Sequence, residues 1–301
     1  MAGAAAALTM LCAPAEAAPA HEIGGSGSAS DGAAKVPDGS VSPAGANDWS
    51  CPPTAAHPRP VVLVHGTWGN QNDWNVLAPQ LKAEGYCVFS LNFGRDTGSV
   101  MGAKPGVYGT GDIRASAGEL AAFTERVRDA TGSAKVDLVA HSQGALVARQ
   151  YLRFEGGAAE VGSLVSLAGT NHGTTMNGLA SLLPPGGSSG PAADLAATYV
   201  GTAAVQQLVG SDVVRTINAG GDTEPGIAYT VVATRLDKAS TPPEATFLQA
   251  GPGATVDNIW VHDVCPTDTF DHGPLPQSPT IAYLVQRALD PAHTGISCPQ
   301  H

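Results

Sequence analysis

The segment Val136-Asp137-Leu138-Val139-Ala140-His141-Ser142-Gln143-Gly144-Ala145-Leu146-Val147 decides the fold of this chain. Its first part, residues 136–139, is a short apolar run with β-branched residues, which is typical of a buried strand. From residue 145 on, apolar residues recur at helical spacing. Ser142 lies between the two parts, with small residues two positions before it and two positions after it. This is the nucleophile-elbow pattern G-x-S-x-G, with Ala140 in the first position. It predicts a sharp turn that presents the Ser142 hydroxyl; the alternative is a serine that only caps a helix.

Apolar runs and helical patterns alternate along the chain around this segment. We expect strands at 61–64, 87–93, 161–168, 229–234 and 256–262, and helices at 74–84, around 119–127 and at 281–289. This alternation predicts an α/β fold with a mostly parallel sheet and helices on both faces. Residues 176–226 differ, because small residues dominate and Leu and Val are scattered. There we expect a partial cap of short helices and loops over the sheet.

Composition divides the chain into three parts. The 301 residues are 43% hydrophobic and 14% charged, which suits one large globular domain or two small ones. Residues 1–20 are apolar and Ala-rich, with small residues at Ala18 and Ala20, which predicts a signal peptide even though no Lys or Arg precedes the apolar part. Residues 21–50 consist mostly of small and polar residues, and we expect a disordered leader there. The main domain is then expected at 51–301, with 176–226 as its cap-like insertion.

The net charge of −11 restricts the partners of the chain. The sequence has no basic stripe that would neutralise phosphates, which argues against nucleic acid as a partner. The acidic balance also disfavours electrostatic docking on anionic membranes.

The cysteines bear on the cellular location. Cys12 lies in the predicted signal peptide, and four cysteines remain in the main domain. An even number in an exported chain suggests two disulfides, for which four cysteines allow three connectivities. We favour Cys51–Cys87, which would tie the entry segment to a strand, and Cys265–Cys298, which would tie down the tail. No pair has C-x-x-C spacing, so zinc and thioredoxin-like chemistry are not expected. We expect a secreted, extracellular protein.

A serine hydroxyl becomes a nucleophile when a base takes its proton and a carboxylate orients that base. With an elbow of this kind, the order along the chain is Ser, then Asp or Glu, then His. Asp237 is our candidate for the acid, because it follows the expected strand 229–234 by three residues. Ligand-facing groups of such a sheet lie at the carboxyl ends of its strands. Asp222 is the rival, but it precedes that strand and therefore belongs to the opposite edge.

His272 is our candidate for the base, because it lies in the loop after the last expected strand. His293 follows the closing helix and would suit only a later acid, Asp263 or Asp268. We expect His141 to pack beneath the turn and His262 to be a packed or solvated strand terminus. His65 and His172 lie at carboxyl ends of strands, where they are candidates to line the pocket, and we favour supporting hydrogen bonds for both.

Acyl transfer also requires hydrogen-bond donors for the oxyanion that develops on the substrate. One donor is expected to be the backbone N–H of Gln143, directly after the nucleophile. The other is expected from the glycine-containing loop 65–69, and we choose the N–H of Thr67, with Trp68 as the alternative. By itself this loop is equally an ordinary glycine turn.

Four motifs together resemble one known family. They are His65-Gly66-Thr67, Ala140-His141-Ser142-Gln143-Gly144, Ala233-Thr234-Arg235-Leu236-Asp237, and Cys265-Pro266-Thr267-Asp268 followed by His272. In combination they are similar to the secreted class 2 lipases of the α/β-hydrolase superfamily, from Cys51 on. The resemblance implies an α/β-hydrolase fold, and a carboxylic-ester hydrolase that acts on acylglycerols or similar esters without a metal or organic cofactor. It also supports the two disulfides.

The substrate contacts are expected in the insertion. Met176 and Leu179 are candidates to line an acyl-binding groove together with Trp68. The alternative is that these apolar residues only fill the space above the sheet, and it accounts for them nearly as well. We expect an ester or lipid substrate, a transient contact with a lipid interface, and a monomer.

Other functions share these residues. A short-chain esterase, a cutinase-like polyester hydrolase and an acyltransferase use the same chemistry. A secreted binding module on an inactive hydrolase scaffold is a more remote alternative, because such a module would usually have lost one of the three residues. The acidic stretch with Asp257, Asp263, Asp268 and Asp271 matches no calcium loop, and we expect solvated carboxylates rather than a metal site.

Overall fold

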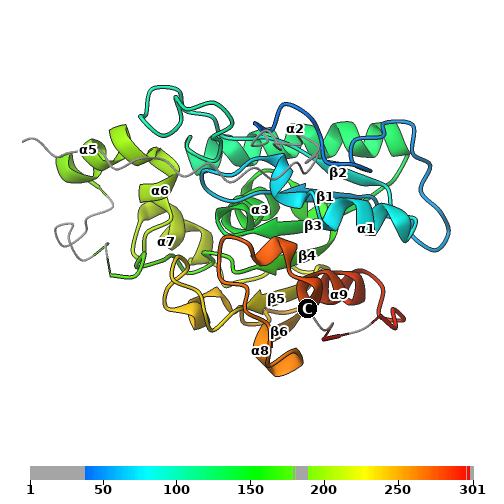
Figure 1. The fold of residues 1–301 in the computed structure, drawn as a ribbon. Helices are drawn as coiled ribbons and strands as arrows, with labels where there is room; N and C mark the ends of the chain where they lie inside the picture. Colours follow the sequence, from blue (N-terminus) through cyan, green and yellow to red (C-terminus); the bar gives the residue numbers. More distant parts are fainter. Residues whose placement is uncertain (1–37, 179, 181–188, 296, 299–301) are drawn as a thin grey trace, which may run out of the picture. The chain divides into compact units, whose positions relative to one another are not determined.

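A parallel sheet of six strands in the order β2-β1-β3-β4-β5-β6 organises the described residues of the computed structural model (Figure 1). The strands are β1 (Val61–Val64), β2 (Val88–Ser90), β3 (Val136–His141), β4 (Val161–Leu167), β5 (Ala228–Ala233) and β6 (Thr255–Trp260). All five pairs of neighbouring strands are parallel. The structure describes residues 38–178, 180, 189–295, 297 and 298. The predicted signal peptide, residues 21–37 of the predicted leader, and Leu179 lie outside this description.

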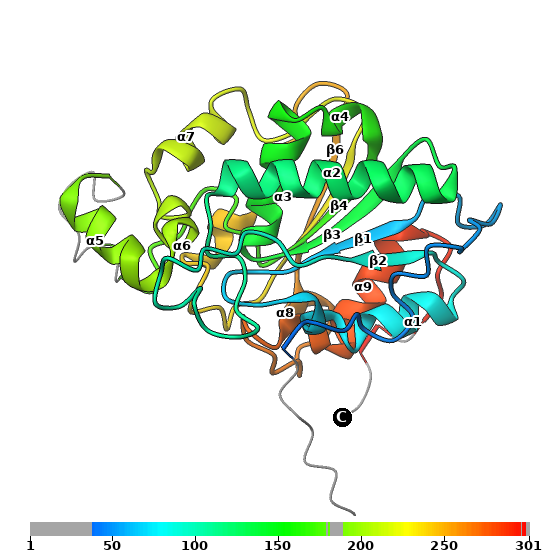
Figure 2. The same cartoon turned by 90° about the horizontal axis from the view of Figure 1, so that it is seen from above.

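Helices cover both faces of the sheet, as predicted (Figure 2). They are α1 (Leu77–Ala83), α2 (Ile113–Thr131), α3 (Gln143–Phe154), α4 (Gly157–Glu160), α5 (Pro191–Val200), α6 (Thr202–Gln206), α7 (Asp212–Asn218), α8 (Val261–Val264) and α9 (Pro279–Leu289), with short 3-10 turns η1 (Gln71–Trp74), η3 (Pro243–Thr246) and η4 (Leu275–Gln277). Helices α2 and α3 pack on one face, and α1 and α9 pack on the other. Within the described ranges, none of the helices has the length and apolar character that a membrane crossing needs.

Strand β1 shows why the apolar runs of the sequence form this sheet. All four of its residues are fully buried. Val62 and Val64 join the hydrophobic core under α2 and α3, whereas Val61 and Leu63 join the core under α1 and α9. Side chains alternate between the faces of a strand, so a continuous apolar run is stable only where both faces are covered. The predicted α/β fold is therefore confirmed.

The prediction of a last strand over residues 256–262 is wrong at its carboxyl end. Strand β6 stops at Trp260, and the short helix α8 follows it. His262 consequently lies on a helix rather than at a strand terminus. Val261 extends the apolar run Ile259-Trp260, which is why the sequence did not reveal the change.

We predicted disorder for residues 21–50, and this prediction is wrong for residues 38–50. Ala46 forms a bridge to Val88 at the outer edge of β2, and the Asn47 N–H donates to the Val88 carbonyl at 2.9 Å. The Trp49 ring packs on Phe89 with ring centroids 5.0 Å apart. This segment thus covers an edge strand that would otherwise expose unpaired backbone groups. A composition of small and polar residues concealed the contribution of Trp49 to holding this segment in place.

Both predicted disulfides form. Cys51 pairs with Cys87, with Cα atoms 5.7 Å apart, and Cys265 pairs with Cys298. The first joins the residues before β1 to the start of β2. The second joins the segment after α8 to the residues that follow α9. The bridges close loops with sequence separations of 36 and 33, so we expect both to stabilise the folded chain.

We predict that the double variant Cys51→Ala/Cys87→Ala has a lower free energy of unfolding than the parent. The bridge closes a loop with a sequence separation of 36, and on the chain-entropy model its loss costs about 3 to 4 kcal/mol. Denaturant unfolding followed by circular dichroism, under non-reducing conditions, measures the difference. An unchanged midpoint would show that the bridge adds no stability.

Candidate active site

Ser142 lies in a strained turn between β3 and α3. Its backbone has φ 54° and ψ −126°, in a region that residues other than glycine rarely adopt. A β-carbon at Gly144 would lie 2.5 Å from the Val64 carbonyl oxygen, so only glycine lets α3 approach β1 this closely. Steric crowding therefore explains the glycine that follows Ser142 by two positions in the elbow pattern. The turn at Ser142 is as sharp as the sequence predicted.

The structure brings together the three side chains predicted to carry the chemistry. His272 Nε2 lies 2.9 Å from Ser142 Oγ, and His272 Nδ1 lies 2.8 Å from Asp237 Oδ2. An ionised carboxylate only accepts hydrogen bonds, so Nδ1 carries the hydrogen and Nε2 accepts from the Ser142 hydroxyl. This is the tautomer that a general base requires.

Asp237 is held by its own loop. One carboxylate oxygen, Oδ1, accepts hydrogen bonds from the backbone N–H groups of Ala239 and Ser240, both at 2.8 Å. The other oxygen remains for His272, and the Asp237 side chain is only 2% exposed. The carboxylate is therefore fixed in orientation before a substrate arrives.

His141 positions the loop of His272 in a way that the sequence did not reveal. Its Nε2 lies 2.9 Å from the His272 backbone carbonyl, and the two rings are 4.9 Å apart. A carbonyl only accepts, so His141 donates from Nε2. Burial, and then the charge of the neighbouring His272, hold the pKa of His141 well below its usual range. We expected this side chain only to pack beneath the turn.

Asp268 also fixes the His272 loop. It is buried, and it accepts hydrogen bonds from Ser278 Oγ at 2.6 Å and from the Phe270 N–H at 2.9 Å. The acidic stretch therefore contains one structural carboxylate and not only solvated ones. Asp263 pairs with Arg235 instead. Across the described part of the chain, no cluster of His, Cys, Asp or Glu is arranged to hold a metal ion.

A cavity of about 100 Å³ opens beside Ser142 and His272. Thr67, Trp68 and Met176, three of the residues we predicted around the substrate, line it. The predicted contact Leu179 lies outside the described residues.

Of the two predicted oxyanion donors, Thr67 lines the same cavity, and Gln143 directly follows Ser142, which also lines it. Gln143 is the first residue of α3, so its N–H has no acceptor within the helix, and the positive end of the helix dipole lies there. Thr67 follows β1 and lines the cavity. The Gln143 side chain joins the two, because its Nε2 donates to Thr67 Oγ1 at 3.0 Å and to the Gly109 carbonyl at 3.1 Å.

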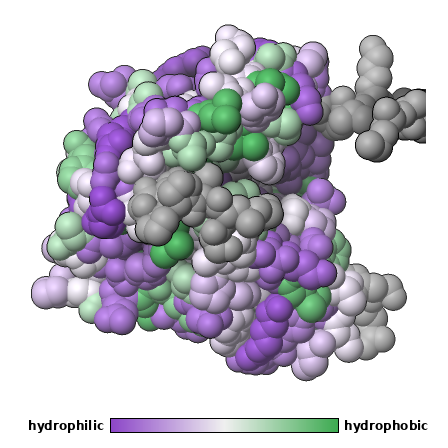
Figure 3. Space-filling model, turned by 90° about the vertical axis from the view of Figure 1, so that its left-hand side faces the viewer, coloured by the Kyte–Doolittle hydropathy of each residue, from purple (hydrophilic) through white to green (hydrophobic). Residues whose placement is uncertain are grey.

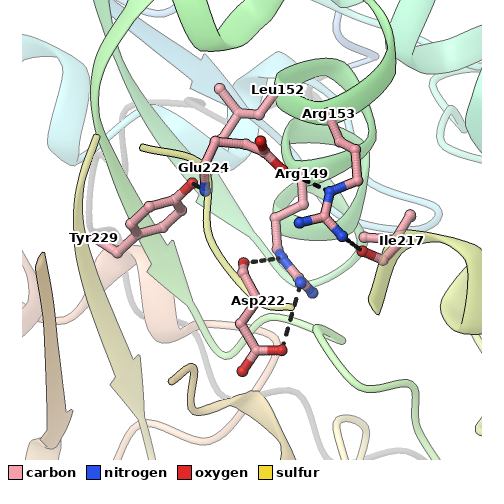
Figure 4. Close-up of a pocket in the computed structure, with 7 residues that line it drawn as sticks. All are labelled: Arg149, Leu152, Arg153, Ile217, Asp222, Glu224 and Tyr229. Carbon is pink, nitrogen blue, oxygen red and sulfur yellow. Dashed lines mark hydrogen bonds and ion pairs between the residues drawn. The ribbon is translucent and has the colours of Figure 1, made fainter. Parts of the chain in front are cut away.

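Asp222, the rival acid, belongs to a separate cluster (Figure 4). Arg149 of α3 is buried, and it donates to the Asp222 carbonyl at 3.1 Å and to the Asn171 carbonyl at 2.8 Å. Burial lowers the pKa of Arg149 to about 10, so it stays charged at neutral pH. His172 Nε2 lies 2.9 Å from the Asp222 carboxylate. These contacts fix the segment after β4, and they are not part of the site around Ser142.

His65 is a structural residue. It is fully buried and stacks on Phe93 with ring centroids 4.2 Å apart. Its Nδ1 lies 2.8 Å from the Gly66 carbonyl, to which it donates. Burial lowers its pKa to about 4, so it is uncharged at neutral pH. It supports the loop of Thr67.

We predict that His172→Gln loses stability in a pH-dependent way. The hydrogen bond with Asp222 raises the pKa of His172. Burial opposes ionisation of Asp222, but the hydrogen bonds from His172 and from the Gln249 N–H outweigh it and lower the Asp222 pKa. The His172 contribution is therefore complete below its unfolded pKa of about 6.5 and is lost as pH rises through the higher folded value.

Unfolding free energies of parent and variant measured from pH 5 to pH 9 check this. The difference between them should be largest near pH 5 and should shrink toward pH 9. A difference that grows with pH would contradict the assigned pair.

Comparison with known proteins identifies the family of this chain and supports its fold. Residues 58–244 match the family model of class 2 lipases, which is more than half of the 301 residues. The chain belongs to the class 2 lipase family. The matched region includes Ser142 and Asp237 and ends before His272, and the arrangement of all three residues rests on the geometry above.

Solved structures share the fold of this class 2 lipase. Aspergillus fumigatus lipase B has a TM-score of 0.63 at 18% identity, over 85% of this chain and 56% of that one. Bacillus licheniformis lipase BlEst2 in its mature form has a TM-score of 0.54 at 19% identity, over 78% and 94% of the two chains. The chain thus spans only about half the length of the fungal lipase. At these identities the likeness establishes the fold alone.

Proposed function

We propose that this class 2 lipase is a secreted serine carboxylic-ester hydrolase that acts on triacylglycerols. The observation that carries the proposal is the continuous hydrogen-bond chain from Ser142 through His272 to Asp237, beside an open cavity. A serine that only caps a helix has no need of an oriented imidazole on its hydroxyl. The two disulfides suit an oxidising, extracellular environment.

In the acylation step, Ser142 Oγ attacks the carbonyl carbon of the ester while His272 Nε2 takes the hydroxyl proton. The carbonyl π electrons move to its oxygen, which becomes an oxyanion. Asp237 stabilises the imidazolium that forms, without taking a proton itself. When the carbonyl re-forms, the C–O bond to the alcohol breaks, and His272 returns its proton to the leaving oxygen.

In the deacylation step, a water molecule repeats the sequence on the acyl-enzyme. His272 takes a proton from the water as its oxygen attacks the acyl carbon. The bond to Ser142 Oγ then breaks, and His272 returns the proton to Oγ. In both steps the N–H groups of Gln143 and Thr67 donate to the oxyanion. Such a donor typically contributes about 2.7 to 4 kcal/mol to the stability of the transition state.

The surface around α5 supports a lipid substrate. Leu195 and Tyr199 lie four residues apart on α5 and are 62% and 58% exposed. Val100, whose N–H donates to the Thr198 carbonyl, is also exposed. We call Val100, Leu195 and Tyr199 the α5 patch. Figure 3 looks onto the side of the molecule that carries α5, where apolar groups interrupt a mostly hydrophilic surface. Trp68, at the wall of the cavity, donates to the Val200 carbonyl at 2.8 Å, which links the patch to the site.

A short-chain esterase, a cutinase-like polyester hydrolase and an acyltransferase would use the same three residues. Rates over a series of p-nitrophenyl esters from C2 to C16 separate these enzymes. A triacylglycerol lipase retains activity on the long esters and on emulsified triolein. A transferase would instead give the acyl product of an added alcohol acceptor in preference to the free acid.

We predict that Ser142→Ala abolishes hydrolysis of p-nitrophenyl butyrate and keeps the parent circular dichroism spectrum. Asp237→Asn is expected to reduce kcat by about 10⁴-fold, the loss that follows when the histidine takes the wrong tautomer. Steady-state kinetics measure both effects. A folded Ser142→Ala variant with substantial turnover would reject the mechanism.

We predict that Leu195→Ser/Tyr199→Ser lowers the rate on phosphatidylcholine-stabilised triolein emulsions by at least about tenfold. Each large apolar side chain that leaves water contributes about 1.5 to 3 kcal/mol to binding at an apolar surface. Hydrolysis of dissolved p-nitrophenyl acetate should stay at the parent rate. Val41→Ser is the matched control, because Val41 is 73% exposed outside the α5 patch. Equal losses on both substrates would reject a role at the lipid surface.

A further inference from the structure

The hydroxyl of Thr67 is held by two buried amide side chains. Gln143 Nε2 donates to Thr67 Oγ1 at 3.0 Å, and Gln207 Nε2 donates to the same oxygen at 2.9 Å. A threonine hydroxyl has two acceptor lone pairs, so these bonds use both of them. Gln143 is the first residue of α3, and the nucleophile-elbow pattern already assigned it the role of an oxyanion donor. Gln207 belongs to no motif that the sequence revealed.

Gln207 comes from the insertion between β4 and β5 and is itself rigidly placed. It follows the last residue of α6 and is only 3% exposed. Its backbone N–H donates to the Ala203 carbonyl at 3.1 Å, and its carbonyl accepts from the Thr174 N–H at 2.9 Å. The side chain therefore reaches Thr67 from a backbone fixed on both sides, and it lines the cavity beside Ser142.

A second hydrogen bond joins the insertion to the same loop. The Trp68 indole Nε1 donates to the Val200 carbonyl, at the last residue of α5, at 2.8 Å. Trp68 has φ 60°, a conformation that costs free energy in a residue other than glycine and persists only when surrounding contacts enforce it. The loop that carries the Thr67 N–H is thus strained, and the insertion supplies two of the contacts that hold it.

We propose that Gln207 is a positioning residue for the oxyanion hole, which makes the insertion part of the catalytic machinery and not only a cover. The proposal rests on the proposed function of Ser142 and extends it to a residue outside the three-residue chain. Gln207 acts through Thr67: its amide fixes the Thr67 hydroxyl, and with it the direction of the neighbouring backbone N–H. Donors aimed at the oxyanion contribute more in the transition state than in the ground state. Loss of Gln207 therefore lowers kcat with little change in KM.

The experiment compares Gln207→Leu, Thr67→Val and the double variant with p-nitrophenyl butyrate as substrate. Gln207→Leu keeps the approximate volume of the side chain and removes the donor. We expect kcat to fall between about 10- and 100-fold, as for small misplacements of a catalytic group, with KM within about twofold of the parent. Affinity for an alkyl trifluoromethyl ketone, which forms a tetrahedral adduct, should fall by the same factor as kcat.

The double variant tests whether Gln207 acts through Thr67. Thr67→Val removes the oxygen that both amides bind, so Gln207→Leu should cause less than about a twofold further loss of kcat in that background. Fully multiplicative losses would mean that Gln207 acts independently of Thr67 and would overturn the proposal.

Gln206→Leu is the matched control. Gln206 is the last residue of α6 and directly precedes Gln207. Its side chain contacts the start of α2, because it accepts a hydrogen bond from the Ile113 N–H at 2.7 Å and donates one to Asp112. These side-chain hydrogen bonds run to α2 rather than to the Thr67 loop, so loss of Gln206 should lower the thermal midpoint and leave kcat at the parent value. A parent-like kcat in folded Gln207→Leu would overturn the inference. Failure of the parent enzyme to hydrolyse any ester would instead reject the proposed function.

Discussion

The close approach of α3 to β1 is the constraint on which the site depends. Gly144 lies against the Val64 carbonyl, where a β-carbon would come within 2.5 Å of the oxygen, and Ser142 takes a positive φ to make the turn. This strain needs a rigid surrounding structure. The sheet, buried on both faces around β1 and β3, provides it. The Ser142 hydroxyl and the first amide of α3 are therefore placed together by one turn of the backbone.

The other functional groups reach this turn from loops that polar side chains hold in place. Asp237 is fixed by two backbone N–H groups of its own loop, and the His272 carbonyl is bound by His141, the residue before the nucleophile. The loop of Thr67 is held by amides from α3 and from the insertion. Each group is thus oriented before substrate binds, which is the condition for electrostatic stabilisation of a transition state.

Much of the fold, and the meeting of Ser142, His272 and Asp237, could be predicted from the sequence. Apolar runs such as 61–64 predicted buried parallel strands, and the small residues around Ser142 predicted the elbow. The positions of Asp237 and His272 followed from the order of functional groups along the chain and from the carboxyl ends of strands. Local pattern and topology were sufficient in these cases, because both act on short stretches or on fixed geometry.

Supporting contacts could not be predicted, because they pair residues far apart in the chain. Gln207 and Thr67 are separated by 140 positions, and Arg149 and Asp222 by 73. Trp49 lies in a segment whose composition indicated disorder, yet its ring packs on Phe89. Which buried polar group meets which partner depends on the packed structure, and no local spacing indicates it.

Identification of the residue modified by a fluorophosphonate tests the central claim most directly. The protein is labelled at neutral pH, digested, and the adduct is located by mass spectrometry. Our account predicts a stoichiometric adduct on Ser142 in the parent protein and none in a folded His272→Ala variant within the same labelling time. An adduct on another serine, or an unmodified Ser142 in folded parent protein, would contradict it.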